Sequence, residues 1–175
     1  MTVSVVENKL EALAKFSALI GGLVLVAVMI MSVLSIAGRA LVPIGLTPIP
    51  GDFELVEVGT AFAVFCFLPL CQLKSGHVTV DLIVPAIGPR NDAILAVFHN
   101  LLMTVVLVFI TWRAFGGLQD VKQYNETSFI LQFPLWWGYA VCLPFAGLAA
   151  VVSAFTAWRS FTEARDATRA AGKRS

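Results

Sequence analysis

Long hydrophobic stretches dominate the chain, and four of them carry almost no charge. They cover residues 16–37, 53–73, about 93–112 and about 133–158. A helix needs about 20 largely apolar residues to cross the roughly 30 Å hydrocarbon core of a bilayer. The pattern therefore predicts an all-α membrane protein with four transmembrane helices, forming a single membrane domain over residues 1–175.

Two segments outside these stretches have patterns of their own. Residues 78–87 are too apolar for free solvent and too short to span a bilayer, and Pro85, Gly88 and Pro89 break the segment before the third stretch. We expect a short interfacial segment there, between the second and third helices. Residues 159–175 are expected to form a tail that begins as a short helix and then frays.

The first stretch has an alternative interpretation as a cleaved signal peptide. Ser35 and Ala37 resemble the small residues of a cleavage site. However, its 22 apolar residues exceed the roughly 7–15 of a signal-peptide core. We therefore expect the segment to remain as the first span.

Composition and charge sharpen this topology. Charged residues make up 13% of the chain, against about 25% in soluble domains. Nine Lys and Arg residues lie on the side of the termini and three on the other side, and cytoplasmic loops carry the excess of such residues. Both termini are thus predicted to be cytoplasmic. The net charge is only +1 and the basic residues are scattered, which does not indicate nucleic-acid binding.

Small residues recur at every fourth position of the fourth stretch. Such spacing lets helix backbones approach closely in lipid, although an alanine-rich helix can also show it by chance. The candidate packing seam consists of Gly138, Cys142, Ala146 and Ala150. Cys142, like Cys66 and Cys71, is interpreted as a reduced packing residue because no C-x-x-C pair is present.

The candidate polar chemistry lies at the start of the second stretch. Glu54 and Glu57 share one helix face, and Asp52 can cap the same helix end. Arg39 leaves the first stretch at a similar level, so a pair with Glu54 or Glu57 is predicted. The alternative role is binding of an ion or proton during transport, which intramembrane carboxylates often perform.

Histidines raise a second alternative. His77 lies in a loop, whereas His99 lies inside the third stretch. A bis-histidine haem needs both rings in one cavity, so we expect no bound cofactor and interpret His99 as a hydrogen-bonding residue between helices. No metal-ligand cluster, phosphate-binding loop or nucleophile–base pair is visible in the sequence, so no enzyme activity is expected.

The missing charges at membrane depth favour an auxiliary subunit. Carriers of polar solutes usually show midplane charges, broken helices or inverted repeats. A haem- or quinone-linked membrane anchor and a stand-alone homodimeric transporter, with Glu57 as its coupling group, remain alternatives.

Several motifs resemble the small membrane (Q, DctQ-type) subunit of tripartite ATP-independent periplasmic (TRAP) transporters. They are Pro50-Gly51-Asp52-Phe53-Glu54-Leu55-Val56-Glu57, Leu68-Pro69, and Gly76-His77-Val78 with Val80-Asp81. Before and within the fourth stretch they are Glu126-Thr127, Leu131, Pro134, Trp136-Trp137, Tyr139, Pro144 and Gly147. The likeness covers most of residues 16–158.

This resemblance implies sodium-driven uptake of an organic acid across a bacterial inner membrane, with a soluble periplasmic protein binding the solute. A large membrane subunit would hold the substrate and sodium sites, and the small subunit would be its stationary scaffold, surrounded by membrane lipids. By the same resemblance, Glu54, Glu57, Gly76, His77 and Asp81 would hold structure or contact the large subunit. The outer loop 113–132 would face the periplasm and could touch the binding protein.

Overall fold

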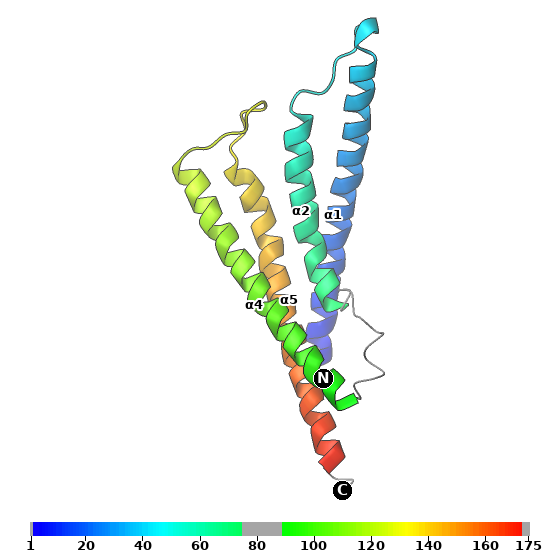
Figure 1. Ribbon diagram of the computed structural model, residues 1–175, viewed down its shortest axis with the longest axis vertical. Helices are drawn as coiled ribbons and strands as arrows, with labels where there is room; N and C mark the ends of the chain where they lie inside the picture. Colours follow the sequence, from blue (N-terminus) through cyan, green and yellow to red (C-terminus); the bar gives the residue numbers. More distant parts are fainter. Residues whose placement is uncertain (1, 75–88, 173–175) are drawn as a thin grey trace.

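The computed structural model describes residues 2–74 and 89–172, which form four long helices and no β-strand (Figure 1). The elements are α1 (Thr2–Ala40), the 3₁₀ turn η1 (Val42–Ile44), α2 (Asp52–Leu73), α4 (Pro89–Gln123) and α5 (Trp136–Gly172). Each long helix contains a stretch long and apolar enough to cross a membrane. The predicted fold class is thereby confirmed. The predicted interfacial segment 78–87 and residues 173–175 lie outside the described residues.

Three of the helices are longer than the apolar stretches that predicted them. α1 has 39 residues, α4 has 35 and α5 has 37. At 1.5 Å per residue α1 is about 58 Å long, so it exceeds the hydrocarbon thickness of about 30 Å. Charged residues end an apolar run without interrupting backbone hydrogen bonding. For that reason the expected outer loop 113–132 is helical as far as Gln123, and α5 continues to Gly172.

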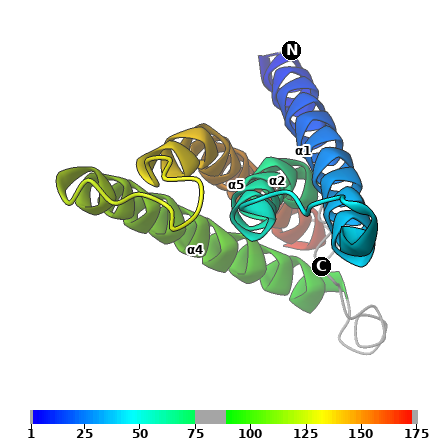
Figure 2. The same cartoon turned by 90° about the horizontal axis from the view of Figure 1, so that it is seen from above.

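The helices form an open row instead of a closed bundle. α1 packs along α2, α2 along α5, and α5 along α4. Among the described residues, α1 and α4 at the two ends of the row do not pack against each other. Seen from above, α1 and α4 lie on opposite sides of the central pair, α2 and α5 (Figure 2). α5 is therefore the helix that joins the two halves of the chain.

The row opens into a V. Both termini lie toward one end of the molecule, here called the terminal end, and the α1–α2 and α4–α5 connections lie at the other, the loop end (Figure 1). The pairs α1–α2 and α4–α5 converge toward the terminal end and diverge toward the loop end (Figure 1).

A buried amide joins three helices near the converging end. Gln72 of α2 is only 1% exposed, and its Nε2 donates to Asn100 Oδ1 at 3.2 Å and to Thr156 Oγ1 at 3.1 Å. Asn100 Nδ2 in turn donates to Ser160 Oγ at 2.8 Å. A polar group left unpaired in an apolar environment is costly, so these bonds fix α2, α4 and α5 in one arrangement.

Close backbone contact joins α1 to α2. A Cβ placed on Gly21 would lie 2.7 Å from Cys66 Cβ, and one on Gly59 would lie 2.5 Å from Val28 Cγ2. The Ser17 hydroxyl also donates to the Cys66 carbonyl at 2.9 Å. Small residues thus allow the van der Waals packing that holds helices together in lipid.

This contact yields a matched pair of substitutions. Gly21→Ala should destabilise the protein by about 1–3 kcal/mol, because the new methyl group overpacks the α1–α2 contact. Gly22→Ala is the control, since a Cβ at Gly22 meets nothing within 4 Å. Thermal unfolding in one detergent would compare the two. Equal melting temperatures for both variants would contradict the packing assigned to Gly21.

Candidate functional site

The loop end of the α1–α2 pair is fixed by a buried carboxylate. Asp52 Oδ2 accepts hydrogen bonds from the Arg39 guanidinium and, at 2.6 Å, from the Ser35 hydroxyl. Its Oδ1 accepts the Phe53 N–H at 3.0 Å. The Phe53 ring centroid lies 4.9 Å from the Arg39 Cζ. Three groups from two helix ends therefore bond one carboxylate.

The predicted pairing of Arg39 with Glu54 or Glu57 is wrong, because the guanidinium binds Asp52. Asp52 is the first residue of α2, and Gly51 occupies the cap position. At the helix start a short side chain can bond the first-turn N–H and still reach back to α1. Glu54 and Glu57 lie on a face of α2 that is turned toward the α4–α5 connection.

Glu54 binds the connection between α4 and α5, residues 124–135, which we call the strap. Its Oε1 accepts the Ile130 N–H at 2.7 Å, and its Oε2 accepts the Leu131 N–H at 3.0 Å. Charge-assisted bonds of this kind are stronger than those between neutral groups. The carboxylate therefore ties the α4–α5 pair to the α1–α2 pair across the open end of the V.

Leu131 adds an apolar contact to the same tie. A Cβ placed on Gly51 would lie 2.5 Å from Leu131 Cγ, and Gly51 has a φ of +74°. Glycine meets both requirements, since it lacks the Cβ and adopts positive φ readily. The strap thus rests directly on the backbone that precedes α2.

The strap has internal structure that holds its tip in place. The Ser128 N–H donates to the Phe133 carbonyl at 2.9 Å, and the Leu135 N–H donates to the Glu126 carbonyl at 3.0 Å. Gln132, at φ +54°, reverses the chain between these bonds. The strap is consequently an ordered hairpin-like loop, and it presents two backbone N–H groups to Glu54.

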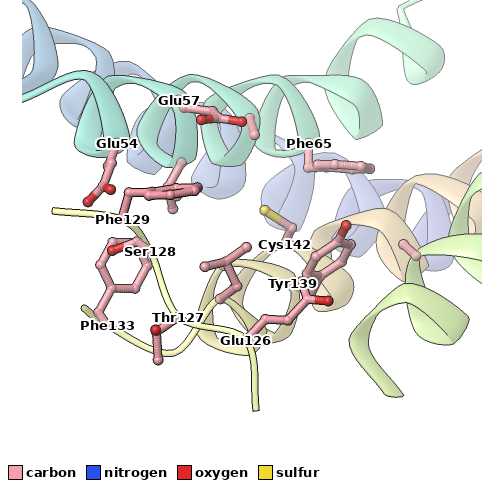
Figure 3. Close-up of a pocket in the computed structure, with 15 residues that line it drawn as sticks. Glu54, Glu57, Phe65, Glu126, Thr127, Ser128, Phe129, Phe133, Tyr139 and Cys142 are labelled. Carbon is pink, nitrogen blue, oxygen red and sulfur yellow. The ribbon is translucent and has the colours of Figure 1, made fainter. Parts of the chain in front are cut away.

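A cavity of about 690 Å³ lies beneath the strap, between α2 on one side and α5 and α4 on the other (Figure 3). Its carboxylates and aliphatic hydroxyls come from the strap and the first turns of α2: Glu54, Glu57, Glu126, Thr127 and Ser128. Tyr139 of α5 adds a phenol, and the remaining lining is Val58, Ala61, Phe65, Ala114, Phe129, Phe133, Leu135, Gly138 and Cys142. The cavity is therefore acidic at the loop end and mostly apolar along its length.

The carboxylates of this cavity differ in their contacts. Glu54 binds the strap, whereas Glu57 and Glu126 form no ion pair within residues 2–74 and 89–172. The Ser128 residue is 7% exposed, and its hydroxyl lies beside the Glu54 carboxylate. The described residues also contain no group of three or more His, Cys, Asp and Glu side chains suited to a metal ion.

The other candidate polar residues are not gathered at this cavity. His99 is exposed on α4, and its neighbour Asn100 makes the described bonds to α2 and α5. Gly76, His77 and Asp81 lie outside the described residues, so the structure does not place them. The sequence analysis did not identify the Ser128 hydroxyl or the Gln72 amide as candidate polar groups. An amide inside an apolar stretch does, however, indicate a buried hydrogen-bonding role.

The candidate seam of α5 lies on both contacts of that helix. Gly138 faces Val58 of α2, where an added Cβ would lie 3.6 Å away. Cys142 and Ala146 are buried, and the Ala146 carbonyl accepts the Thr111 hydroxyl of α4 at 3.2 Å. Ala150 is half-buried. The fully buried positions nearby are Ala149, Val152 and Ser153.

Comparison with known proteins gives one family. Residues 25–163 match the family described as tripartite ATP-independent periplasmic transporters, DctQ component. No curated protein and no solved structure matches the chain significantly.

The Glu54 tie makes a testable prediction. Glu54→Ala removes the acceptor of two strap N–H groups, so amide hydrogen exchange in the strap should accelerate by about tenfold or more, the factor for a lost charged hydrogen bond. Mass spectrometry of strap peptides would measure it. Glu57→Ala removes a carboxylate one turn away that bonds no strap amide among the described residues, and it should leave strap exchange unchanged. Similar exchange in both variants would contradict the tie.

Proposed function

The chain belongs to the DctQ component family of tripartite ATP-independent periplasmic transporters, and we propose that it is the fixed scaffold on which a large transport subunit moves. A DctQ component is the small membrane subunit of such a transporter. In the proposed role it supports sodium-driven uptake of an organic acid, and it works with a large membrane subunit and a periplasmic binding protein.

The acidic lining of the cavity is the observation that carries this proposal. An organic acid is an anion at neutral pH, and like charges at close range repel each other. Glu54, Glu57 and Glu126 all line the cavity, and no Lys or Arg does. This lining disfavours an organic acid within the chain and supports a substrate site in another subunit.

The deeper polar groups support the same role. Gln72, Asn100 and Thr156 are neutral, and they bond one another across three helices. Their bonds fix the helices, whereas a transport site must exchange its partners with a moving solute. The network therefore suits a part of the transporter that keeps one shape.

The open row supports assembly with a larger protein. α1 and α4 lie at the two ends of the row. In the most apolar window of each helix, the share buried within the chain is only 11% for α1 and 6% for α4. A row without closure leaves broad apolar faces that lipid or another membrane protein must cover. We propose that one such face carries the large subunit.

The proposed orientation follows from the Lys and Arg distribution. The excess of basic residues near the termini favours a cytoplasmic terminal end. The strap would then face the periplasm. Phe129 of the strap is 95% exposed, so this side offers an aromatic contact for a soluble binding protein.

Reconstitution tests the proposal. Proteoliposomes that contain this chain alone should show no sodium-driven uptake of any organic acid in a panel. Vesicles with this chain, the large subunit and the binding protein should accumulate one of them. Uptake by this chain alone would overturn the scaffold role and favour the stand-alone transporter.

A substitution of Glu57 distinguishes a scaffold role for this residue from a role in sodium coupling. In the complete complex, Glu57→Gln should change the rate of sodium-coupled uptake by no more than about twofold. The reason is that a scaffold side chain makes no interaction specific to the transition state of transport. Glu11→Gln, which removes a carboxylate paired with Lys15 on α1, is the control. Loss of sodium coupling with assembly intact would assign Glu57 to an ion site.

A further inference from the structure

The tip of the strap exposes an aromatic ring on a backbone that is held in place. Phe129 is 95% exposed, and the next residue, Ile130, is 57% exposed. The backbone on both sides of the ring is nevertheless hydrogen-bonded. The Ser128 N–H donates within the strap, the Phe129 carbonyl accepts Gln132 Nε2 at 2.9 Å, and the Ile130 N–H donates to Glu54. The ring therefore projects from a fixed support.

Gln132 holds the tip of the strap from within. Its Nε2 donates to the Phe129 carbonyl, and its Oε1 accepts the Thr127 hydroxyl at 3.2 Å. Its φ of +54° is a conformation that residues other than glycine adopt mainly where surrounding contacts enforce it. Such conformations are most frequent at functional sites. The side chain and backbone of Gln132 thus give the tip one shape.

An exposed ring on a fixed backbone is suited to binding a protein. Aromatic side chains are enriched at protein–protein interfaces, where a few anchors supply most of the binding free energy. Ordering a loop during association lowers the affinity. Because the bonds around Phe129 already order the tip, little of that cost remains when a partner binds.

The position and charge of the strap favour a soluble protein over lipid. The membrane-capable stretch of α4 ends at Gln123 and that of α5 begins at Trp136, so the strap lies outside both. Residues 124–135 contain one charged side chain, Glu126, and no Lys or Arg. Segments that bind the membrane interface are typically rich in Lys and Arg. The carboxylates of Glu126 and Glu54 instead complement a basic protein surface.

We propose that the strap is a docking element for a soluble protein, with Phe129 inserted in an apolar pocket that Lys or Arg side chains surround. Glu126 faces that basic rim. Glu54 and Gln132 are positioning residues, because they act through the shape of the tip. The inference rests on the proposed function, in which the soluble partner is the binding protein of the transporter.

The affinity of the binding protein for the membrane complex tests the anchor. This chain and the large subunit would be held together in nanodiscs, and binding of the purified binding protein would be measured by biolayer interferometry. Phe129→Ala should weaken binding by about thirtyfold or more, the size of a hot-spot loss. Ile44→Ala is the matched control. It truncates a 72% exposed residue of η1 at the same end of the molecule, and it should leave the affinity unchanged.

Glu54→Ala and Gln132→Ala test the positioning role. Each substitution keeps the ring and loosens its support, so the affinity should fall by about three- to tenfold, the cost of ordering the tip on binding. Combined with Phe129→Ala, neither substitution should weaken binding further, because the support acts only through the ring. Additive losses in the double variants would contradict this role.

Salt dependence tests the charge of the partner surface. Raising NaCl from about 50 to about 300 mM should weaken binding, because screening reduces the attraction between the carboxylates and a basic rim. Glu126→Gln should reduce this dependence. Binding that does not change with salt would contradict the basic rim.

Cross-linking identifies what covers the ring. Phe129 would be replaced by the photoreactive p-benzoylphenylalanine in proteoliposomes that contain all three proteins, and mass spectrometry would identify the adducts. Adducts with the binding protein are expected. Adducts mainly with lipid or with the large subunit would overturn the proposal, as would equal affinities of Phe129→Ala and Ile44→Ala.

The same measurements separate this inference from the scaffold role. Unchanged affinity of Phe129→Ala together with normal uptake by the three proteins would overturn the docking element alone. Uptake by this chain without its partners would overturn the scaffold role instead.

Discussion

The tie between Glu54 and the strap is the interaction on which the loop end of this protein depends. Lipid supplies no hydrophobic force between helices, so two helix pairs that diverge need a specific contact to stay at one separation. Glu54 supplies it by accepting the Ile130 and Leu131 N–H groups. The cavity exists because this bond holds the strap over the opening of the V, and Ser128 and Glu126 of the strap contribute to its lining.

The terminal end is held by different chemistry. There the helices converge, and the Gln72 amide bonds side chains from both α4 and α5. Neutral amides and hydroxyls bind one another at modest cost in a membrane, whereas the three carboxylates that line the cavity lie toward the loop end. A rigid neutral junction at one end and an acidic, bridged opening at the other suit a subunit that supports a transport site and does not contain one.

Much of the fold could be predicted from the sequence, because apolar length alone identifies a membrane-spanning helix. The helix ends could not, since residues such as Arg113 and Lys122 leave the apolar run while their backbone stays helical. The partner of Arg39 was also beyond prediction, because three carboxylates lie within six residues and only the start of α2 decides which one reaches back. Glu54 bonds backbone N–H groups that lie 76 and 77 residues further along the chain. A bond to a backbone group does not depend on which side chain is there, so no sequence pattern predicts it.

The Asp52 cluster has a mechanical consequence when it is considered together with the strap. The two carboxylates lie two residues apart on α2, one bonded to the end of α1 and the other to the α4–α5 connection. A force applied to the exposed strap is therefore transmitted through a single helical turn to all four helices. The first turn of α2 would therefore be displaced when a partner contacts the strap from outside the bilayer. The stiffness of that turn would determine how far the displacement is transmitted into the membrane.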